Sequence, residues 1–302
     1  MKSLILGTDW WTDCDDGVAL RLLTNAHKAG HIRLLGIVIN ACMEDSVRSM
    51  DAFLAKDGVT DVPIALDPDA TDFGGRLTYQ FRLAPHAVRY RSNADAENGV
   101  TLYRRLLAAA DSPVEILEIG FLQVFSALLE SRGDEISPKT GRELVAQKVS
   151  HCWVMAGKWD ADGEKEHNFA RNPRARIAAE QFCRSCPVPV TFLGWEAGVG
   201  ILSGGELSHN DHLWQMLSDH GSAQGRHSWD PLLVRLALIG DAEKAGYSLV
   251  RGTARVDAET GENFFTPSIE GSHAYVIKEK EDSYYEHALN RAIIPGERSL
   301  IS

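Results

Sequence analysis

The sequence lacks an apolar run long enough to cross a bilayer, and its first residues lack the pattern of a secretory signal peptide. Basic residues are also scarce, because 31 Lys and Arg stand against 42 Asp and Glu and give a net charge of −11 at pH 7. Such an acidic chain is poorly suited to nucleic acid or an anionic membrane as its main partner. The five cysteines are an odd and scattered set, which is typical of a reduced protein. We therefore expect a cytoplasmic protein with neither of those partners.

The sequence also lacks internal repeats and Gly/Ser-rich linkers. Its 302 residues are enough to bury a core without disulfides. Hydrophobic residues make up 44% of the chain and charged residues 24%, as in ordinary globular proteins. We therefore expect residues 1–302 to form a single domain.

Short apolar runs alternate with amphipathic segments along the chain, and this alternation predicts an α/β fold with right-handed parallel crossovers. Strands are expected at residues 4–8, 34–40, 61–66, 114–119, 149–155, 188–193, 247–256 and 273–277. Helices are expected at residues 43–55, 99–110, 120–130, 172–183, 232–239 and 282–292, with a mostly helical region from 194 to 240. Residues 67–95 are expected to be a long loop with some helix that can cover a site, and residues 131–147 a surface excursion. The prediction is a mostly parallel, Rossmann-like open sheet flanked by helices.

The stretch from residue 4 to residue 20 begins as a buried strand and ends as an amphipathic helix. Four carboxylates lie between them: Asp9, Asp13, Asp15 and Asp16. Open α/β sheets bind ligands at the carboxyl ends of their strands, so this turn is a candidate site. Four like charges in one turn repel one another unless protonation or a cation relieves them. A hard divalent cation with oxygen ligands is the natural counter-charge.

Other interpretations of this acidic turn are weaker. Asp15 and Asp16 could simply favour a helix N-terminus, but that role needs one or two acids and not four. An EF-hand is excluded, because the glycine is misplaced and the twelfth position counted from Asp13 is Thr24. A phosphatase of the Asp-x-Asp type needs a second acid where this chain has Trp11.

Polar groups recur at later strand ends and helix starts. Asn40 follows the second predicted strand, and Glu166 and Asn168 lie in a polar loop after the fifth. Their donors and acceptors suit sugar hydroxyls, although polar loops are common without function. Asp230 opens a helix before Pro231, which alone reads more simply as helix capping. It gains a functional meaning only if it meets the N-terminal acids in space.

Five of the seven tryptophans fall at predicted strand ends or helix starts: Trp10, Trp11, Trp159, Trp195 and Trp229. Aromatic side chains usually fill cores. Five on one rim would also suit a flat ligand that stacks, such as a nucleobase.

The cysteines 183 and 186 form a single C-x-x-C at the end of a predicted helix. A zinc site needs a second pair, and a redox site needs this motif at a helix start. We therefore interpret the pair as structural.

In this order the motifs resemble those of the inosine-uridine-preferring nucleoside hydrolases. The Asp-rich N-terminal signature carries most of the resemblance, in a variant with two extra residues between Asp9 and the Asp15–Asp16 pair. Weaker matches follow in the family's order, at residues 38–40, 119–122, 166–168 and 229–231. The resemblance covers most of the chain and implies the nucleoside hydrolase fold. It also implies an enzyme of nucleoside salvage that cleaves the N-glycosidic bond of ribonucleosides with the help of Ca²⁺, commonly as a homodimer or homotetramer.

The resemblance also implies roles for individual residues. Asp9 would bind calcium and accept the proton of the attacking water, as the catalytic base. The remaining calcium ligands would be Asp16, Asp230 and the backbone carbonyl of Ile119. The residues implied to hold the ribose hydroxyls are Asp15, Asn40, Glu166 and Asn168.

Departures from the family pattern concern the leaving base. The family's histidine before the final aspartate is Trp229 here, so His227 or His167 would have to act as the acid, or the base leaves without one after stacking on Trp229 and Trp159. Asp13 has no counterpart in the commoner signature. Two alternatives to a hydrolase therefore stay open: a catalytically weak protein that binds nucleosides or sugars, and a metal-dependent phosphatase.

Overall fold

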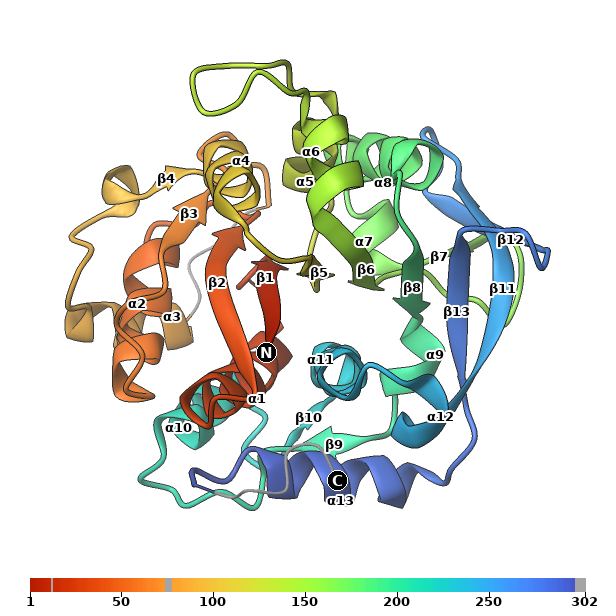
Figure 1. The fold of residues 1–302 in the computed structure, drawn as a ribbon. Helices are drawn as coiled ribbons and strands as arrows, with labels where there is room; N and C mark the ends of the chain where they lie inside the picture. The colour runs from red at the N-terminus through yellow and green to blue at the C-terminus, as the bar shows by residue number, and fades with distance from the viewer. Residues whose placement is uncertain (12, 74–77, 297–302) are drawn as a thin grey trace.

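The computed structural model describes residues 1–11, 13–73 and 78–296, and most of its strands join one sheet (Figure 1). The strand order in that sheet is β4-β3-β2-β1-β5-β6-β8-β13-β11-β12-β7. The strands are β1 (Lys2–Thr8), β2 (Ile32–Ile39), β3 (Ile64–Leu66), β4 (Glu97–Asn98), β5 (Val114–Glu118), β6 (Val149–Met155), β7 (Glu164–Lys165), β8 (Val190–Leu193), β11 (Tyr247–Val256), β12 (Glu262–Pro267) and β13 (His273–Lys278). From β4 to β13 each neighbouring pair is parallel, whereas β11 and β12 pair antiparallel with their neighbours. The mostly parallel sheet predicted from the sequence is confirmed.

Helices cover both faces of the sheet (Figure 1). One face carries α4 (Gly99–Ala109), α5 (Gln123–Glu130), α6 (Gly141–Lys148) and α8 (Pro173–Ser185). The other face carries α1 (Asp15–Lys28), α10 (His212–His220), α11 (Trp229–Ile239) and α13 (Asp282–Ala292). The remaining helices are α2 (Ser46–Lys56), α3 (Thr78–Leu83), α7 (His167–Ala170), α9 (Trp195–Gly198) and α12 (Ala242–Ala245), with 3-10 turns at Ala84–His86 and Asn93–Asp95.

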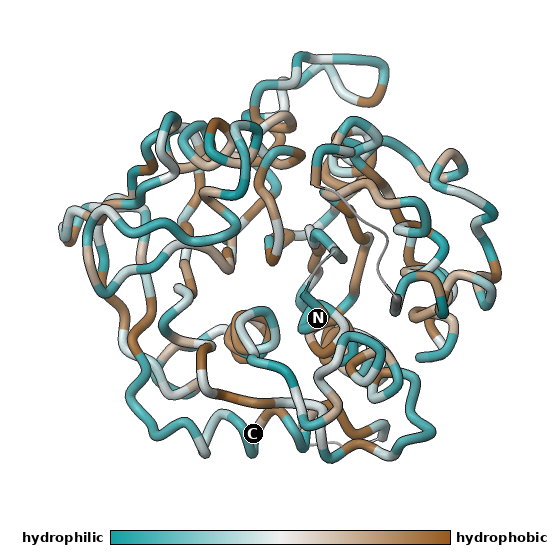
Figure 2. The backbone as a smooth tube through the Cα atoms, turned by 180° about the vertical axis from the view of Figure 1, so that it is seen from behind, coloured by the Kyte–Doolittle hydropathy of each residue, from teal (hydrophilic) through white to brown (hydrophobic). Residues whose placement is uncertain are grey.

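The apolar core follows this layering. One buried cluster lies between the sheet and α1, α11 and α13, and a second between the sheet and α4, α5 and α8. Figure 2 shows hydrophobic residues concentrated along the inner strands and α11, and hydrophilic residues along the outer loops. Since α11 packs against both α1 and β6, its first residues come close to the acidic turn that precedes α1.

Most predicted elements are present, with shifts of a few residues at their ends, and the structure adds three features that were not predicted. The excursion at 131–147 contains α6, whose start is stabilised by a reciprocal capping box between Thr140 and Glu143. The region expected to be mostly helical also contains the short antiparallel pair β9 (Leu202–Ser203) and β10 (Arg226–His227). Strand β12 was not predicted, because its apolar and polar residues alternate only weakly and a polar turn precedes it. The expected loop at 67–95 includes α3 and the two 3-10 turns, and its residues 74–77 lie outside the described residues.

Within the described ranges, no helix is both long and apolar enough to span a bilayer. All five cysteine thiols are free, and Cys183 is buried at the end of α8.

Candidate active site

A cavity of about 300 Å³ opens at the carboxyl edge of the parallel strands. Its wall includes Asp9 and Ile119, which directly follow β1 and β5, and Met155, the last residue of β6. The first residues of α1, α7, α9 and α11 also line it, so the N-termini of four described helices face the cavity. Their partial positive charge favours anionic side chains there. The predicted location of the site, at the carboxyl ends of the strands, therefore coincides with this cavity.

Three carboxylates form a tight buried group on the cavity wall. Oxygen atoms of Asp15, Asp16 and Asp230 lie within 4.8 Å of one another, and each residue is at most 5% exposed. At this spacing two ionised carboxylates repel each other by about 3 kcal/mol at an effective dielectric constant of about 20. Three such pairs together rival the entire stability of a typical domain, which is about 5–15 kcal/mol. The three acids therefore cannot all be ionised without a counter-charge.

The burial and mutual repulsion of these acids also displace their pKa values. Burial is the main cause that raises the pKa of Asp16 to about 7. Burial, followed by neighbouring carboxylates, raises the pKa of Asp9, Asp15 and Asp230 well above the usual range. Asp9 is not part of the three-carboxylate group within the described residues, although the charge of Asp16 contributes to its raised pKa.

The backbone orients the acids before any ligand binds. Trp10 has a φ of 48° and is the one non-glycine residue of the described chain with a positive φ. This turn lets the Trp10 N–H donate to Asp16 Oδ1 at 3.2 Å and the Trp11 N–H donate to Asp9 Oδ1 at 3.2 Å. From α11, the Asp230 N–H donates to Asp15 Oδ2 at 3.0 Å, across 215 positions of the sequence. A non-glycine residue keeps such a rare backbone conformation only where contacts with the surrounding structure hold it there.

The strained turn is locked by its neighbours. Trp10 is fully buried, its ring packs edge-on against Phe53 and Tyr79, and its Nε1–H donates to Ser49 Oγ at 2.9 Å. The Tyr79 hydroxyl donates to the Trp11 carbonyl at 2.7 Å. The region predicted to cover the site therefore does reach the acidic turn, through its described part.

The residues present fit a hard divalent cation. The donors are carboxylate oxygens that are buried, preoriented and too close to be ionised together without one. Calcium prefers such all-oxygen sets. The group differs in one member from the ligand set implied by the family resemblance, because Asp15 stands where Asp9 was expected.

Glu166 and Asn168 form a second polar wall of the cavity. The Glu166 side chain caps α7 and accepts from the backbone N–H groups of Gly157 at 2.9 Å and Asn168 at 2.9 Å. Burial nevertheless raises the pKa of Glu166 to about 7. Asn168 Nδ2 donates to the Met155 carbonyl at 2.9 Å. Both side chains line the cavity and are fixed on the same short helix.

The mouth of the cavity is aromatic and carries one guanidinium. The rings of Trp195 and Trp229 stack with their centroids 6.4 Å apart, and Trp229 Nε1–H donates to the Trp195 carbonyl at 2.7 Å. The Arg226 guanidinium lies 5.4 Å from the centre of the Trp229 ring. His167, at the first position of α7, stacks on Trp11 with centroids 5.9 Å apart. All except Trp11 line the cavity.

Asp13, which had no predicted role, binds Arg226. Its two carboxylate oxygens accept from Arg226 Nε at 2.6 Å and Nη2 at 2.5 Å. Burial would raise the pKa of Asp13, but the hydrogen bonds and charge of Arg226 outweigh it and lower that pKa. The pair joins the acidic turn to β10, 213 positions further along the chain.

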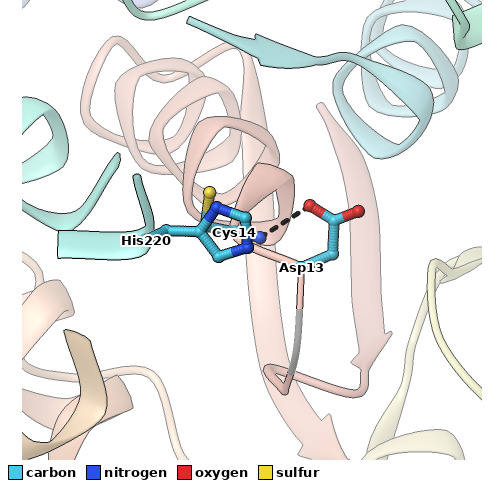
Figure 3. A group of neighbouring side chains, drawn as sticks. All are labelled: Asp13, Cys14 and His220. Atoms are coloured by element: carbon cyan, nitrogen blue, oxygen red, sulfur yellow. Dashed lines mark hydrogen bonds between the residues drawn. The ribbon is translucent and has the colours of Figure 1, made fainter. Parts of the chain in front are cut away.

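Asp13 also belongs to a second group of possible metal ligands, with Cys14 and His220 (Figure 3). The Cys14 N–H donates to Asp13 Oδ1 at 2.8 Å. Burial raises the pKa of the Cys14 thiol far above its usual value, so the sulfur stays protonated, and Asp13 is already occupied by Arg226. We assign no metal to this group.

Three of the predicted site residues do not line the cavity in the described structure. Asn40 is buried behind the wall, where its Oδ1 accepts from the Phe121 N–H at 3.0 Å and its Nδ2 has no partner. Trp159 is 6% exposed and stacks on Tyr275 with centroids 5.8 Å apart, as part of the core rather than of a base-binding surface. His227 uses its Nδ1 to accept from the Gly200 N–H at 3.0 Å.

Sequence reasoning missed Arg226. The residue precedes a histidine in a region expected to be helical, and neither periodicity nor spacing distinguishes it from a surface arginine. The unassigned Asp13 was the available signal, since an extra acid in an already acidic turn favours a cation nearby.

No protein-family model matches this sequence, and no curated protein matches it. Solved structures match over nearly the whole chain. An inosine-uridine-preferring nucleoside hydrolase from Bacillus anthracis is 12% identical with a TM-score of 0.67, covering 97% of this chain and 99% of its own. A purine-preferring ribonucleoside hydrolase from Gardnerella vaginalis is 17% identical with a TM-score of 0.72, covering 99% and 100%. The type III effector protein XopQ, complexed with adenosine diphosphate ribose, is 16% identical with a TM-score of 0.65, covering 99% and 94%. This chain therefore has the fold of the nucleoside hydrolases, and the predicted fold class is confirmed.

Proposed function

We propose that this protein hydrolyses the N-glycosidic bond of ribonucleosides to free base and ribose, with Ca²⁺ as its cofactor. The observation that carries the proposal is the preoriented group of Asp15, Asp16 and Asp230, which shares one cavity with Asp9 and with the polar wall of α7. Two structures of the same fold are described as nucleoside hydrolases, which is consistent with this use of the cavity.

Calcium would be held by carboxylate oxygens of Asp15, Asp16 and Asp230, with the Ile119 carbonyl and Asp9 as the further ligands implied by the family resemblance. When bound, calcium supplies a Lewis acid that lowers the pKa of water and holds hydroxyl groups in place. This also explains why the protein keeps three buried acids in contact, since the ion removes the repulsion that would otherwise destabilise the fold.

Asp9 is the proposed base. It lies at the end of β1 and lines the cavity, and one of its oxygens is held by the Trp11 N–H. A carboxylate at this place can act as a general base, because it lies within the same cavity as the proposed calcium ligands. The second oxygen of Asp9 accepts a proton from the water that attacks C1′ of the ribose.

The polar wall is the proposed ribose site. Glu166 and Asn168 present oxygens to the cavity from a helix start that several backbone hydrogen bonds fix in place. Fixed acceptors position ribose hydroxyls without losing entropy at the moment of reaction. As the C1′–N bond breaks, positive charge develops on the sugar and the surrounding carboxylates stabilise it. In this proposal Asn40 does not touch the ribose. It accepts a hydrogen bond from the Phe121 N–H and so supports the cavity wall from behind.

The test is ribose release from a panel of purine and pyrimidine ribonucleosides, with Ca²⁺ and with EDTA. Release that EDTA abolishes and added Ca²⁺ restores is the expected result. Ca²⁺ binding without ribose release from any nucleoside would overturn the proposal and favour a protein that only binds nucleosides. Phosphate release from a panel of phosphoesters would instead support a phosphatase. Sedimentation of the same sample would test the homodimer or homotetramer predicted from the sequence.

A further inference from the structure

Arg226 is a cation built into an otherwise acidic cavity. Two of its nitrogens donate to Asp13, at 2.6 and 2.5 Å, and its guanidinium lies over the Trp229 ring at 5.4 Å. A bidentate carboxylate and an aromatic face together fix both the position and the plane of a guanidinium. Arginine also stays protonated throughout the physiological pH range. The cavity therefore has a permanent positive charge in one defined place.

One edge of this guanidinium is available to a ligand. The third nitrogen, Nη1, makes no hydrogen bond to any described residue, while the side chain lines the cavity and is 25% exposed. Asp13 balances the charge of Arg226. Arg226 therefore does not need to pair with the acids that would hold calcium. A fixed N–H donor next to a stacking ring suits a flat, polar group.

The histidines do not fill this role. Trp229 occupies the position of the family's histidine, and His227 faces Gly200 rather than the cavity. His167 does line the cavity, but it stacks on Trp11, away from the Trp195–Trp229 pair that would hold a base. The family pattern accounts for neither Asp13 nor Trp229, and the structure places Arg226 in contact with both of them.

We propose that Arg226 stabilises the departing base, with Nη1 as a hydrogen-bond donor to the base while it stacks on Trp229. This inference rests on the proposed hydrolase function. It defines the substrate as a ribonucleoside whose base carries a ring carbonyl and can leave as a delocalised anion. Asp13 is a positioning residue, because it acts by holding the guanidinium.

The step balances without a side-chain acid. Water forms the new C1′–O bond and gives one proton to Asp9, and the C1′–N bond breaks with its electron pair going to the base. The base leaves as an anion, its charge spread over ring nitrogen and carbonyl oxygen, and Arg226 keeps its proton throughout. Solvent then protonates the base, and Asp9 returns its proton to solvent.

The test compares uridine with 5-fluorouridine and 5-bromouridine, whose bases are similar in shape but are better leaving groups. For Arg226→Met, kcat/KM for uridine should fall about 100-fold, as for the loss of one donor to a developing anion. The loss should be clearly smaller for the two halogenated nucleosides, because their bases carry negative charge more easily. An equal loss for all three would overturn the proposal, since it would indicate only damaged packing.

Two further variants separate charge from structure. Arg226→Lys should restore part of the activity with uridine, and Asp13→Asn should lower kcat less than Arg226→Met but with the same dependence on the leaving group. The matched control is Arg105→Met, which removes an exposed arginine that pairs with Glu97 and does not line the cavity. This variant should leave kcat/KM unchanged for all three substrates. Asp13→Asn with a uniform loss across the substrates would contradict the positioning role.

A binding measurement distinguishes failure of this inference from failure of the proposed function. Uracil is titrated into the wild-type protein and into Arg226→Met by calorimetry, with Ca²⁺ present. Affinity should fall about ten-fold in the variant, the size of one hydrogen bond to a charged group. If the wild-type protein releases no ribose yet shows this difference, the proposed hydrolysis is wrong and the base contact stands. Equal uracil affinity, with or without turnover, overturns the role of Arg226.

Discussion

The floor and the mouth of the cavity differ in what determines them. The floor consists of Asp9, Asp15, Asp16 and Asp230, each placed by a strand end or a helix start and oriented by the backbone. The mouth consists of side chains that hold one another, with Arg226 as its centre. The carboxylates of Asp15, Asp16 and Asp230 are too close to be ionised together without a counter-charge, which restricts these positions. The mouth has no such restriction, and its proposed role is only to match a base, so its residues can vary without disturbing the fold.

The largest effect is expected at the floor, from Asp9→Asn. The amide cannot accept a proton, so kcat should fall about 10²- to 10⁴-fold, as expected for removal of a general base. Ribose binding should be largely spared, because the asparagine keeps the size and one acceptor of the aspartate. Steady-state kinetics and ribose calorimetry measure the two quantities. Asp61→Asn, at a carboxylate with 80% side-chain exposure, is the matched control, and survival of most activity in Asp9→Asn would contradict the assignment of the base.

The second prediction concerns membership of the floor. Asp15 belongs to the three-carboxylate group, whereas the family resemblance implies that it binds the ribose hydroxyls. If Asp15 is a ligand, Asp15→Asn should weaken Ca²⁺ binding about ten-fold or more, because affinity follows the charge of the ligand set. Calorimetric titration with Ca²⁺ alone measures this, with Asp16→Asn for comparison. Unchanged Ca²⁺ affinity together with a raised KM would assign Asp15 to the sugar instead.

The third prediction concerns the mouth. Trp229→Ala removes a face on which a base would stack, and stacking on an aromatic side chain contributes about 1–3 kcal/mol per base. KM for the preferred nucleoside should rise about ten-fold, with a smaller change in kcat. Trp229→Phe keeps the stack but loses the donor to the Trp195 carbonyl, and it should behave much more like the wild type. A larger effect on kcat than on KM would show that Trp229 itself acts on the chemical step and not on binding alone.

The smallest effect on turnover is expected for Glu118→Gln. Glu118 differs from the acids of the floor because no neighbouring carboxylate contributes to its raised pKa. Glu118 is 2% exposed at the end of β5, accepts from the Tyr103 hydroxyl, and burial raises its pKa to about 8. The folded state therefore holds a proton that the unfolded chain releases near pH 4.5. Its stabilisation is complete below that pH and is lost as the pH rises toward about 8.

Glu118→Gln should remove this loss. The free energy of unfolding, measured with saturating Ca²⁺ from pH 5 to pH 8, should fall less with rising pH in the variant than in the wild type. The difference between the two proteins should be on the order of a few kcal/mol across that window. Parallel pH profiles would mean that Glu118 is ionised in the folded protein.

Much of the fold was predictable because its signals are local. The runs that form β1, β2, β5 and β6 are apolar and short, and the start of α8 carries an asparagine cap followed by proline. β12 and the paired strands β9 and β10 were not predictable, because such short strands gain their stability from their neighbours and not from their own pattern. The same distinction holds within the site, where Glu166 caps α7 through local hydrogen bonds that a sequence can suggest.

The sequence by itself determined that four acids meet at one strand end and that a cation or protonation must relieve their repulsion, because charge and strand position are properties of adjacent residues. Tertiary structure decided the rest. It brought Asp230 to Asp15 across 215 positions and Arg226 to Asp13 across 213, and it withdrew Trp159 into the core. Contacts at such separations depend on how α11 packs against α1 and on where β10 meets the turn that precedes α1. No local pattern encodes that packing, since it follows from burying the whole apolar core at once.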